Sequence, residues 1–372
     1  MALAAAVLLG ALIAPAWRRH VLAAASPGEA TIFPRYPRPG TTAGLRFVPS
    51  PEWTGPDTLW ASGRLDLRVT PRDARRIAYL DFGAPMPRDR DGAYRGRLQL
   101  PDDALAGSLT IWTGASRLPG NRPVFRIALL TADSSGKRPS LDAMEDVVMN
   151  GRGFMTGRTL SDAFARWAPG HPMRWLLTAG RSQSGTFDWL GFFTRSEHRY
   201  SRLARELDAR KRVRPGELAG MAKFAYQIEE PEAASEWTDR LAREYPSSPY
   251  AFALRVDQLH AMELRGAPRD SIARALPSLD TLYALSGGRI LDIYTLRTVV
   301  GNNADSATVR RWTLREARGG AFFPTVMMRG RMAFHDAELR DSVEAFSRDV
   351  LANSYLRDHA PPESWYTTLS RP

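Results

Sequence analysis

The 372-residue chain contains no cysteine, which excludes disulfides, thiolate zinc sites and CxxC redox chemistry. It also lacks histidine pairs of the HxH or HExxH type, and no Gly-rich segment has the spacing of a phosphate-binding loop. From these absences we predict no metal site and no cofactor.

Lysine is rare: Lys137, Lys211 and Lys223 are the only three, so arginine supplies almost all of the positive charge behind the net charge of +11. A basic chain can attract nucleic acid or lipid headgroups. The arginines are scattered, however, and no arginine cluster is interleaved with aromatic residues as in proteins that bind single-stranded nucleic acid. We therefore do not predict nucleic-acid binding. The length and the 44% hydrophobic content predict a sizeable core and two domains.

The first 25 residues resemble a secretory signal peptide. Residues 2–16 are almost wholly apolar, and the small residues at 14–16 or at 23–25 would serve as a cleavage site, although the first basic residues come after the apolar run. The run is at the short limit for a membrane span. We predict a signal peptide or N-terminal anchor over residues 1–25, export to the periplasm or cell envelope, and membrane contact only through this segment. Residues 26–43 are rich in proline and are predicted to be an extended linker or edge segment.

Short alternating apolar and polar runs, separated by Pro, Gly and Asp, predict a β-sandwich over residues 44–132 of immunoglobulin-like or transthyretin-like type. The runs are 45–48, 64–69, 76–82, 94–100, 108–113 and 124–130. In the second run, one face carries Leu65, Leu67 and Val69 and the other carries Arg64, Asp66 and Arg68. This alternation predicts a half-buried strand.

Residues 217–260 have the pattern of paired helices. Apolar residues recur every three or four positions over 218–228 and again over 234–245, which gives each helix one buried stripe. Pro246 ends the second helix and a third begins after Pro249. Tryptophans at helical spacing, Trp237 and Trp312 among them, are expected in the core.

The turn after this helix pair occurs twice in the sequence. Residues 166–177 match residues 243–254 at an offset of 77. In both segments an aromatic residue is followed by a proline, two small or polar residues, a second proline and the apolar start of a helix. The segment around Trp312 echoes that around Trp237. The offset corresponds to two helix pairs slightly longer than a repeat of about 34 residues. We predict an α-helical solenoid over residues 141–357 and a tail over 358–372.

The sequence GRSQSG at residues 180–185 offers an enzymatic alternative, because it approaches the G-x-S-x-G nucleophile elbow of serine hydrolases. Ser182 would be the nucleophile. Its partners would be Asp292 or Asp305 together with His335 or His359. Ser184 occupies the position of the second glycine, and no alternation of strands and helices surrounds the motif, so we favour a loop between helices and predict no catalytic residue.

Leu218, Ala234 and Pro246 give the helix pair a resemblance to the tetratricopeptide-type repeat. Residues 40–320 as a whole, with the phrases DGAYRGRLQLP and REYPSSPYA, resemble the accessory N-terminal region of thioredoxin-like (TlpA-type) bacterial envelope proteins. Without cysteine, the redox activity of that family is not carried over. The resemblance implies an envelope location and a scaffold role. Our first hypothesis is therefore a non-enzymatic, exported protein whose helical-repeat groove binds a protein or peptide partner. The sequence does not identify the partner, the binding residues or the oligomeric state.

Overall fold

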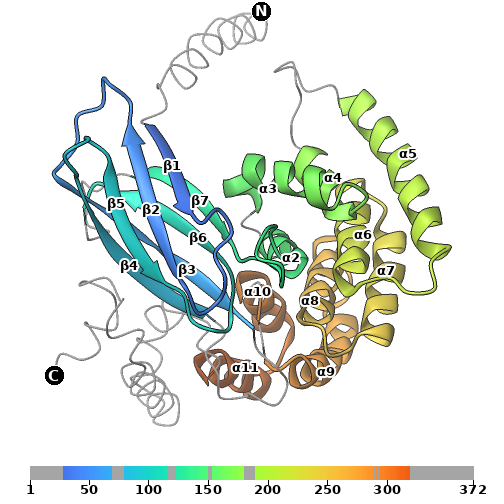
Figure 1. Ribbon diagram of the computed structural model, residues 1–372. Helices are drawn as coiled ribbons and strands as arrows, with labels where there is room; N and C mark the ends of the chain where they lie inside the picture. The colour runs from blue at the N-terminus through green and yellow to red at the C-terminus, as the bar shows by residue number, and fades with distance from the viewer. Residues whose placement is uncertain are drawn as a thin grey trace, which may run out of the picture.

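The computed structural model describes residues 28–68, 79–114, 123–149, 153–179, 189–288, 290–291 and 293–318. A β-sheet region at the N-terminal side is followed by a helical region (Figure 1). The sequence predicts a β-sandwich followed by helices, which is an α+β fold class, and that class is confirmed at this level. The predicted signal segment, the tail and the end of the predicted helical region after residue 318 lie outside the described residues.

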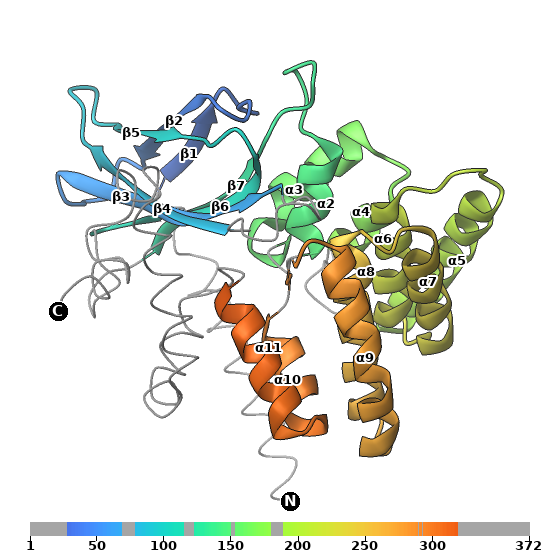
Figure 2. The ribbon, with the colours of Figure 1, turned by 90° about the horizontal axis from the view of Figure 1, so that it is seen from below.

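The β region consists of two antiparallel sheets. One has the strand order β1-β2-β5 and the other β4-β3-β6-β7. The strands are β1 (Gly28–Phe33), β2 (Thr42–Pro49), β3 (Thr58–Leu67), β4 (Tyr79–Pro87), β5 (Tyr94–Gln99), β6 (Ala104–Trp112) and β7 (Pro123–Leu130). The sheets form two layers (Figure 2), and buried side chains of both, including Phe47, Tyr94 and Leu109, make one core between them. Alternation of apolar and polar residues along each strand produces this sandwich.

Each of the six predicted runs overlaps a different one of the strands β2 to β7. β1 lies inside the proline-rich segment, where it forms the edge of its sheet, so within the described residues the sheet region already includes residue 28. Prolines follow this strand at Pro34 and Pro37 and therefore do not interrupt its pairing with β2.

The prediction that Asp66 faces solvent is wrong, because this side chain is fully buried. β3 lies between β4 and β6, and Asp66 is directly opposite Ala106 of β6. Ala106 belongs to the core of the helical region, which covers this end of the sheet. At Asp66 the polar face of the strand is thus covered by helices that the local sequence pattern does not reveal.

Ten helices occur in the described residues: α2 (Leu141–Met149), α3 (Gly153–Trp167), α4 (Pro172–Ala179), α5 (Trp189–Asp208), α6 (Pro215–Gln227), α7 (Pro231–Glu244), α8 (Pro249–Leu264), α9 (Arg269–Leu285), α10 (Ile293–Asn303) and α11 (Ser306–Arg318). Four of them, α4, α6, α7 and α8, begin with proline, whose missing N–H has no helical partner at that position in any case. No helix within the described ranges is long and apolar enough to cross a membrane.

α6 lies at the centre of the helical region and contacts α2, α4, α5, α7 and α8. The predicted stripe of α6 is buried, but Ala219, Gly220 and Phe224 outside that stripe are buried too. The expectation of one buried stripe is therefore wrong for this helix, because neighbours surround it. Gly220 permits the close approach of α4, since a Cβ there would lie 3.0 Å from Pro172.

Candidate functional site

Two turns of equivalent geometry lie on either side of α6. The first turn, residues 168–171, joins α3 to α4, and the second turn, residues 245–248, joins α7 to α8. The same three backbone hydrogen bonds occur in both. They are Ala168 N to Phe164 O, His171 N to Ala168 O and Arg174 N to His171 O in the first turn, and Tyr245 N to Leu241 O, Ser248 N to Tyr245 O and Ala251 N to Ser248 O in the second. The sequence match at an offset of 77 is thus a match in local structure.

Each turn also caps the helix that follows it, but with a different side chain. His171 Nδ1 accepts a hydrogen bond from the backbone N–H of Met173 at 3.2 Å. Ser248 Oγ accepts one from the N–H of Tyr250, also at 3.2 Å. Serine is a common N-cap residue, whereas histidine is not among the preferred ones. The histidine therefore requires a further explanation.

His171 forms a buried polar pair with Glu145 of α2. Its Nε2 lies 3.1 Å from Glu145 Oε1, and the two side chains are only 3% and 2% exposed. Because Nδ1 accepts the Met173 amide hydrogen, the ring proton belongs on Nε2, which donates it to the carboxylate. A buried carboxylate needs such donors to offset the loss of water.

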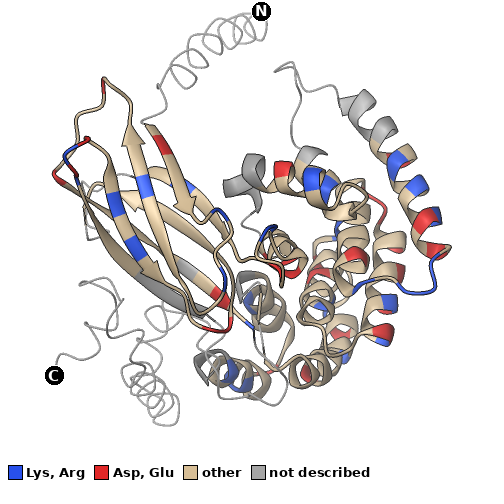
Figure 3. Ribbon diagram, viewed as in Figure 1, with Lys and Arg blue, Asp and Glu red and all other residues tan. Residues whose placement is uncertain are grey.

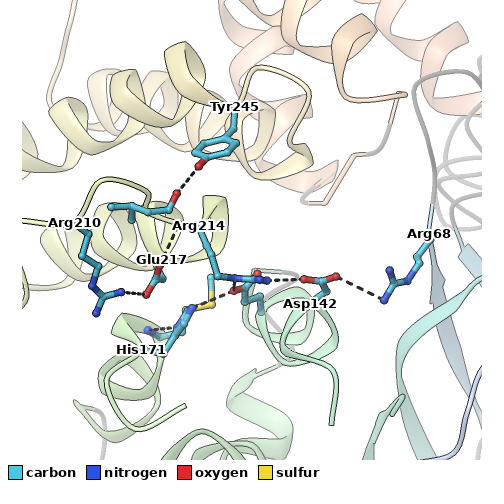
Figure 4. A network of polar contacts seen from close by, with 10 residues as sticks. Arg68, Asp142, His171, Arg210, Arg214, Glu217 and Tyr245 are labelled. Carbon is cyan, nitrogen blue, oxygen red and sulfur yellow. Dashed lines mark hydrogen bonds and ion pairs between the residues drawn. The ribbon is translucent and has the colours of Figure 1, made fainter. Parts of the chain in front are cut away.

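Arg214, in the loop between α5 and α6, extends this pair into a network (Figure 4). Its Nε lies 3.5 Å from Glu145 Oε1, and its Nη2 lies 2.7 Å from Asp142 Oδ1. Asp142 in turn faces Arg68, just beyond the end of β3, at 3.6 Å. Burial lowers the pKa of Arg214, but the nearby carboxylates of Glu145 and Asp142 outweigh it, so the pKa is raised overall. The network therefore connects the sheet region, α2 and the first turn.

Gly216 provides the space for this arrangement. A Cβ at this position would lie 2.0 Å from the carboxyl carbon of Glu145 and 2.1 and 2.4 Å from its two oxygens. Any side chain here would displace the carboxylate from His171. The backbone of α6 thus lies against the buried carboxylate.

The second turn reaches the same loop from the other side. Tyr245 donates its hydroxyl hydrogen to Val213 O at 2.6 Å. In the first helical turn of α6, Glu217 accepts hydrogen bonds from two residues of the preceding loop, from Arg214 N at 3.0 Å and from Arg210 Nη1 at 2.6 Å. Residues 210–217 are consequently held between the two turns, as Figure 4 shows for Tyr245, Arg214 and His171.

This network has the residue types of a catalytic site, but its geometry gives them structural roles. Both ring nitrogens of His171 are engaged, and Glu145 is shared between His171 and Arg214. General base catalysis needs a nitrogen or oxygen that can reach a substrate proton. The arrangement instead braces three helices and a loop. Among the described residues, no group of three or more His, Asp and Glu could hold a metal ion.

Of the residues proposed for a hydrolase, Ser182, Asp292, His335 and His359 lie outside the described residues. Asp305 is described and precedes α11, where its Oδ1 accepts a hydrogen bond from Thr308 N at 2.7 Å. This backbone hydrogen bond lowers the pKa of Asp305. Asp305 therefore acts as a helix cap.

The tryptophans at helical positions lie in the core as expected for Trp237 and Trp312. Trp237 donates its indole hydrogen to Tyr200 OH at 2.7 Å, and Trp312 stacks on Phe252 with ring centroids 5.8 Å apart. These contacts tie α5 to α7 and α8 to α11. Both residues therefore have packing roles.

Comparison with known proteins gives no assignment. No family model matches the chain, and neither a curated protein nor a solved structure matches it.

Proposed function

We propose that this protein is a non-enzymatic, exported scaffold whose helical region binds a protein or peptide partner. The observation that carries the proposal is the pair of equivalent turns, which share three backbone bonds and a helix cap at an offset of 77 residues. A recurring helix–turn–helix unit supports a tetratricopeptide-like solenoid, a fold that presents extended surfaces to polypeptides.

The helix contacts agree with such an arrangement. From α6 to α11, each helix contacts the next one along the chain, and α6 also contacts α8 while α8 contacts α10. In a solenoid, neighbouring units bury one another in this way. The strand orders β1-β2-β5 and β4-β3-β6-β7 likewise support an immunoglobulin-like sandwich beside it.

The charges on the helices favour a polypeptide partner over a nucleic acid. Figure 3 shows basic and acidic residues interspersed along α5 to α9. Many of them pair with each other, as in Lys223 with Asp257 at 2.6 Å and Arg255 with Asp239 at 2.8 Å. Such a surface provides no continuous basic track for phosphates. Export to the periplasm or cell envelope remains a proposal that rests on residues 1–25 and on the family resemblance.

Photo-crosslinking tests the proposal directly. A crosslinker would be placed at Glu236 of α7 or Ser278 of α9, both exposed, in the full chain within its native envelope fraction. We expect a discrete adduct to the same protein from both positions. The absence of any adduct from exposed helical positions would contradict a binding role for this region.

Fluorophosphonate labelling tests the enzymatic alternative. We expect no label on the chain, because the proposal assigns no nucleophile. Covalent labelling that disappears in Ser182→Ala would show a serine hydrolase and would overturn the non-enzymatic assignment.

A further inference from the structure

The outer face of the sheet β1-β2-β5 carries an unusual row of three residues. Phe33 of β1 is directly opposite Gly44 of β2, and Gly44 is directly opposite Arg97 of β5. Phe33 is 78% exposed, and the side chain of Arg97 is exposed. With strands about 4.8 Å apart, the aromatic and basic side chains flank the glycine across roughly 10 Å. We call these three residues the Phe33–Gly44–Arg97 notch.

The fold does not require glycine at position 44. Its backbone has no positive φ, and among the described residues a Cβ there would meet only the carbonyl oxygen of Phe33, at 3.4 Å. Gly63 of β3 is different, because a Cβ there would lie 2.0 Å from the carbonyl oxygen of Ser108. Glycine within a strand is unfavourable unless another group must approach the backbone closely. At Gly63 that group is β6, whereas at Gly44 no described residue other than Phe33 lies within 4 Å of a Cβ.

Arg97 differs from the other arginines of this face. Arg46 and Arg95 are directly opposite each other, and both form ion pairs with Asp91 of the β4–β5 hairpin. In the part of the chain that the structure describes, Arg97 has no hydrogen bond or ion pair. The notch therefore combines an unpaired cation with an exposed aromatic ring. Arginine and aromatic residues are enriched at the centres of protein interfaces.

From this juxtaposition we propose that the notch binds an acidic polypeptide segment, with a carboxylate on Arg97, an apolar side chain on Phe33 and its backbone over Gly44. This inference concerns a surface separate from the helical region and does not rest on the proposed function. The positive net charge of the chain disfavours a second copy as the occupant. A single unpaired cation is also fewer contacts than the series of phosphate contacts typical of nucleic-acid binding.

Fluorescence anisotropy with the full chain tests the proposal. The probe is a fluorescein-labelled peptide of alternating Glu and Leu, and the control peptide has Gln in place of every Glu. We expect the acidic peptide to bind, with an affinity that falls as salt is added, and the Gln peptide to bind about tenfold more weakly.

Three variants separate binding from folding. Gly44→Thr fills the notch while adding a residue that favours strands, so it should weaken binding about tenfold without lowering the thermal midpoint. Arg97→Gln should remove the preference for the acidic peptide over the Gln peptide. Val48→Thr, an exposed change on the same strand about 13 Å away, should leave binding unchanged.

The proposal is overturned if neither peptide binds, if Gly44→Thr binds as tightly as the unaltered chain, or if both peptides bind equally. It is also overturned if an oligothymidylate or a phosphatidylserine vesicle binds in an Arg97-dependent manner more tightly than the acidic peptide. That result would assign the notch to a phosphate-bearing ligand.

Discussion

The two turns that flank α6 share their backbone geometry but differ in the side chain that ties each to residues 210–217. In the first turn, His171 makes this link, because it contacts the buried Glu145, which in turn contacts Arg214. The residue equivalent to Tyr245 in this turn is Ala168, which has no hydroxyl group. In the second turn, Tyr245 bonds directly to Val213, and Ser248 serves only as a local cap. The comparison teaches that one local structure can be retained while its long-range contacts move from one position to another.

The largest expected effect is at His171. His171→Ala removes both the cap and the donor to buried Glu145, so the free energy of unfolding should fall by about 3 kcal/mol. Ser248→Ala removes only a cap and should cost about 1 kcal/mol. His171→Ser restores a cap without the bond to Glu145, so its loss in free energy of unfolding should lie between those of the other two variants. Urea unfolding measures all three free energies. Equal losses for His171→Ala and Ser248→Ala would contradict the claim that His171 does more than cap a helix.

The next effect is at Gly216. Gly216→Ala must displace the carboxylate of Glu145 from His171, so we expect a loss of about 2 kcal/mol, with part of the strain relieved by side-chain movement. Gly170→Ala in the first turn is the matched control, because a Cβ there meets nothing within 4 Å. Its unfolding free energy should change by less than about 0.5 kcal/mol. Equal stabilities for the two variants would show that Glu145 is not held against α6.

A smaller effect is expected from the tether of the second turn. Tyr245→Phe removes the hydroxyl that donates to Val213 O and should cost about 1 kcal/mol. Amide hydrogen exchange across residues 210–217 should accelerate in this variant and in His171→Ala, because both release the same loop. Faster exchange in only one of the two would mean that the loop is held from a single side.

The smallest change in the free energy of unfolding is expected near the C-terminal end of α6, which differs from its N-terminal end. Its N-terminal end carries the satisfied network, whereas the hydroxyl of Tyr226 near its C-terminal end is buried with no hydrogen-bond partner among the described residues. Tyr226→Phe should therefore leave the free energy of unfolding unchanged or raise it by up to about 1 kcal/mol. Tyr200→Phe, which removes the acceptor of the Trp237 hydrogen bond, should lower it by about 1 kcal/mol.

Tyr226 also makes the stability of the folded state depend on pH. Burial raises its pKa to about 12, above the ordinary value of about 10, so the folded state holds the phenolic proton more tightly than the unfolded state. Its contribution to stability is complete below pH 10 and is lost as the pH rises towards 12. Alkaline unfolding should begin at higher pH in Tyr226→Phe than in the unaltered chain. An identical onset in both would show that Tyr226 titrates as an exposed tyrosine.

Local patterns predicted much of the fold. Alternation located six of the seven strands, and proline located the starts of α4 and α8, because both signals arise from residues near in sequence. β1 was predicted only as part of an extended linker or edge segment, since this strand is six residues long and prolines follow it closely. The buried position of Asp66 depends on helices that cover the sheet from far along the chain. Whether the helices form a repeat solenoid stays a prediction.

The polar network could not be predicted from the sequence in the same way. Glu145 and His171 are 26 residues apart, and Arg214 is farther still, so no local spacing brings them together. One signal was present: in the aligned turns, His171 occupies the position of Ser248, directly before a helix-starting proline. That position predicts a cap. Its bond to a buried carboxylate depends on the tertiary packing of α2 and α6.

The central claim is that His171, Glu145 and Arg214 hold helices and a loop together. Its most direct test is the tautomer of His171, which nitrogen-15 NMR of the imidazole ring reports. The structural role requires the ring proton on Nε2, donated to Glu145, with Nδ1 bare and accepting the Met173 amide hydrogen. We predict this tautomer in the full chain and its loss when Gly216→Ala displaces Glu145. A proton on Nδ1 in the unaltered chain would contradict the brace and reopen a chemical role for His171.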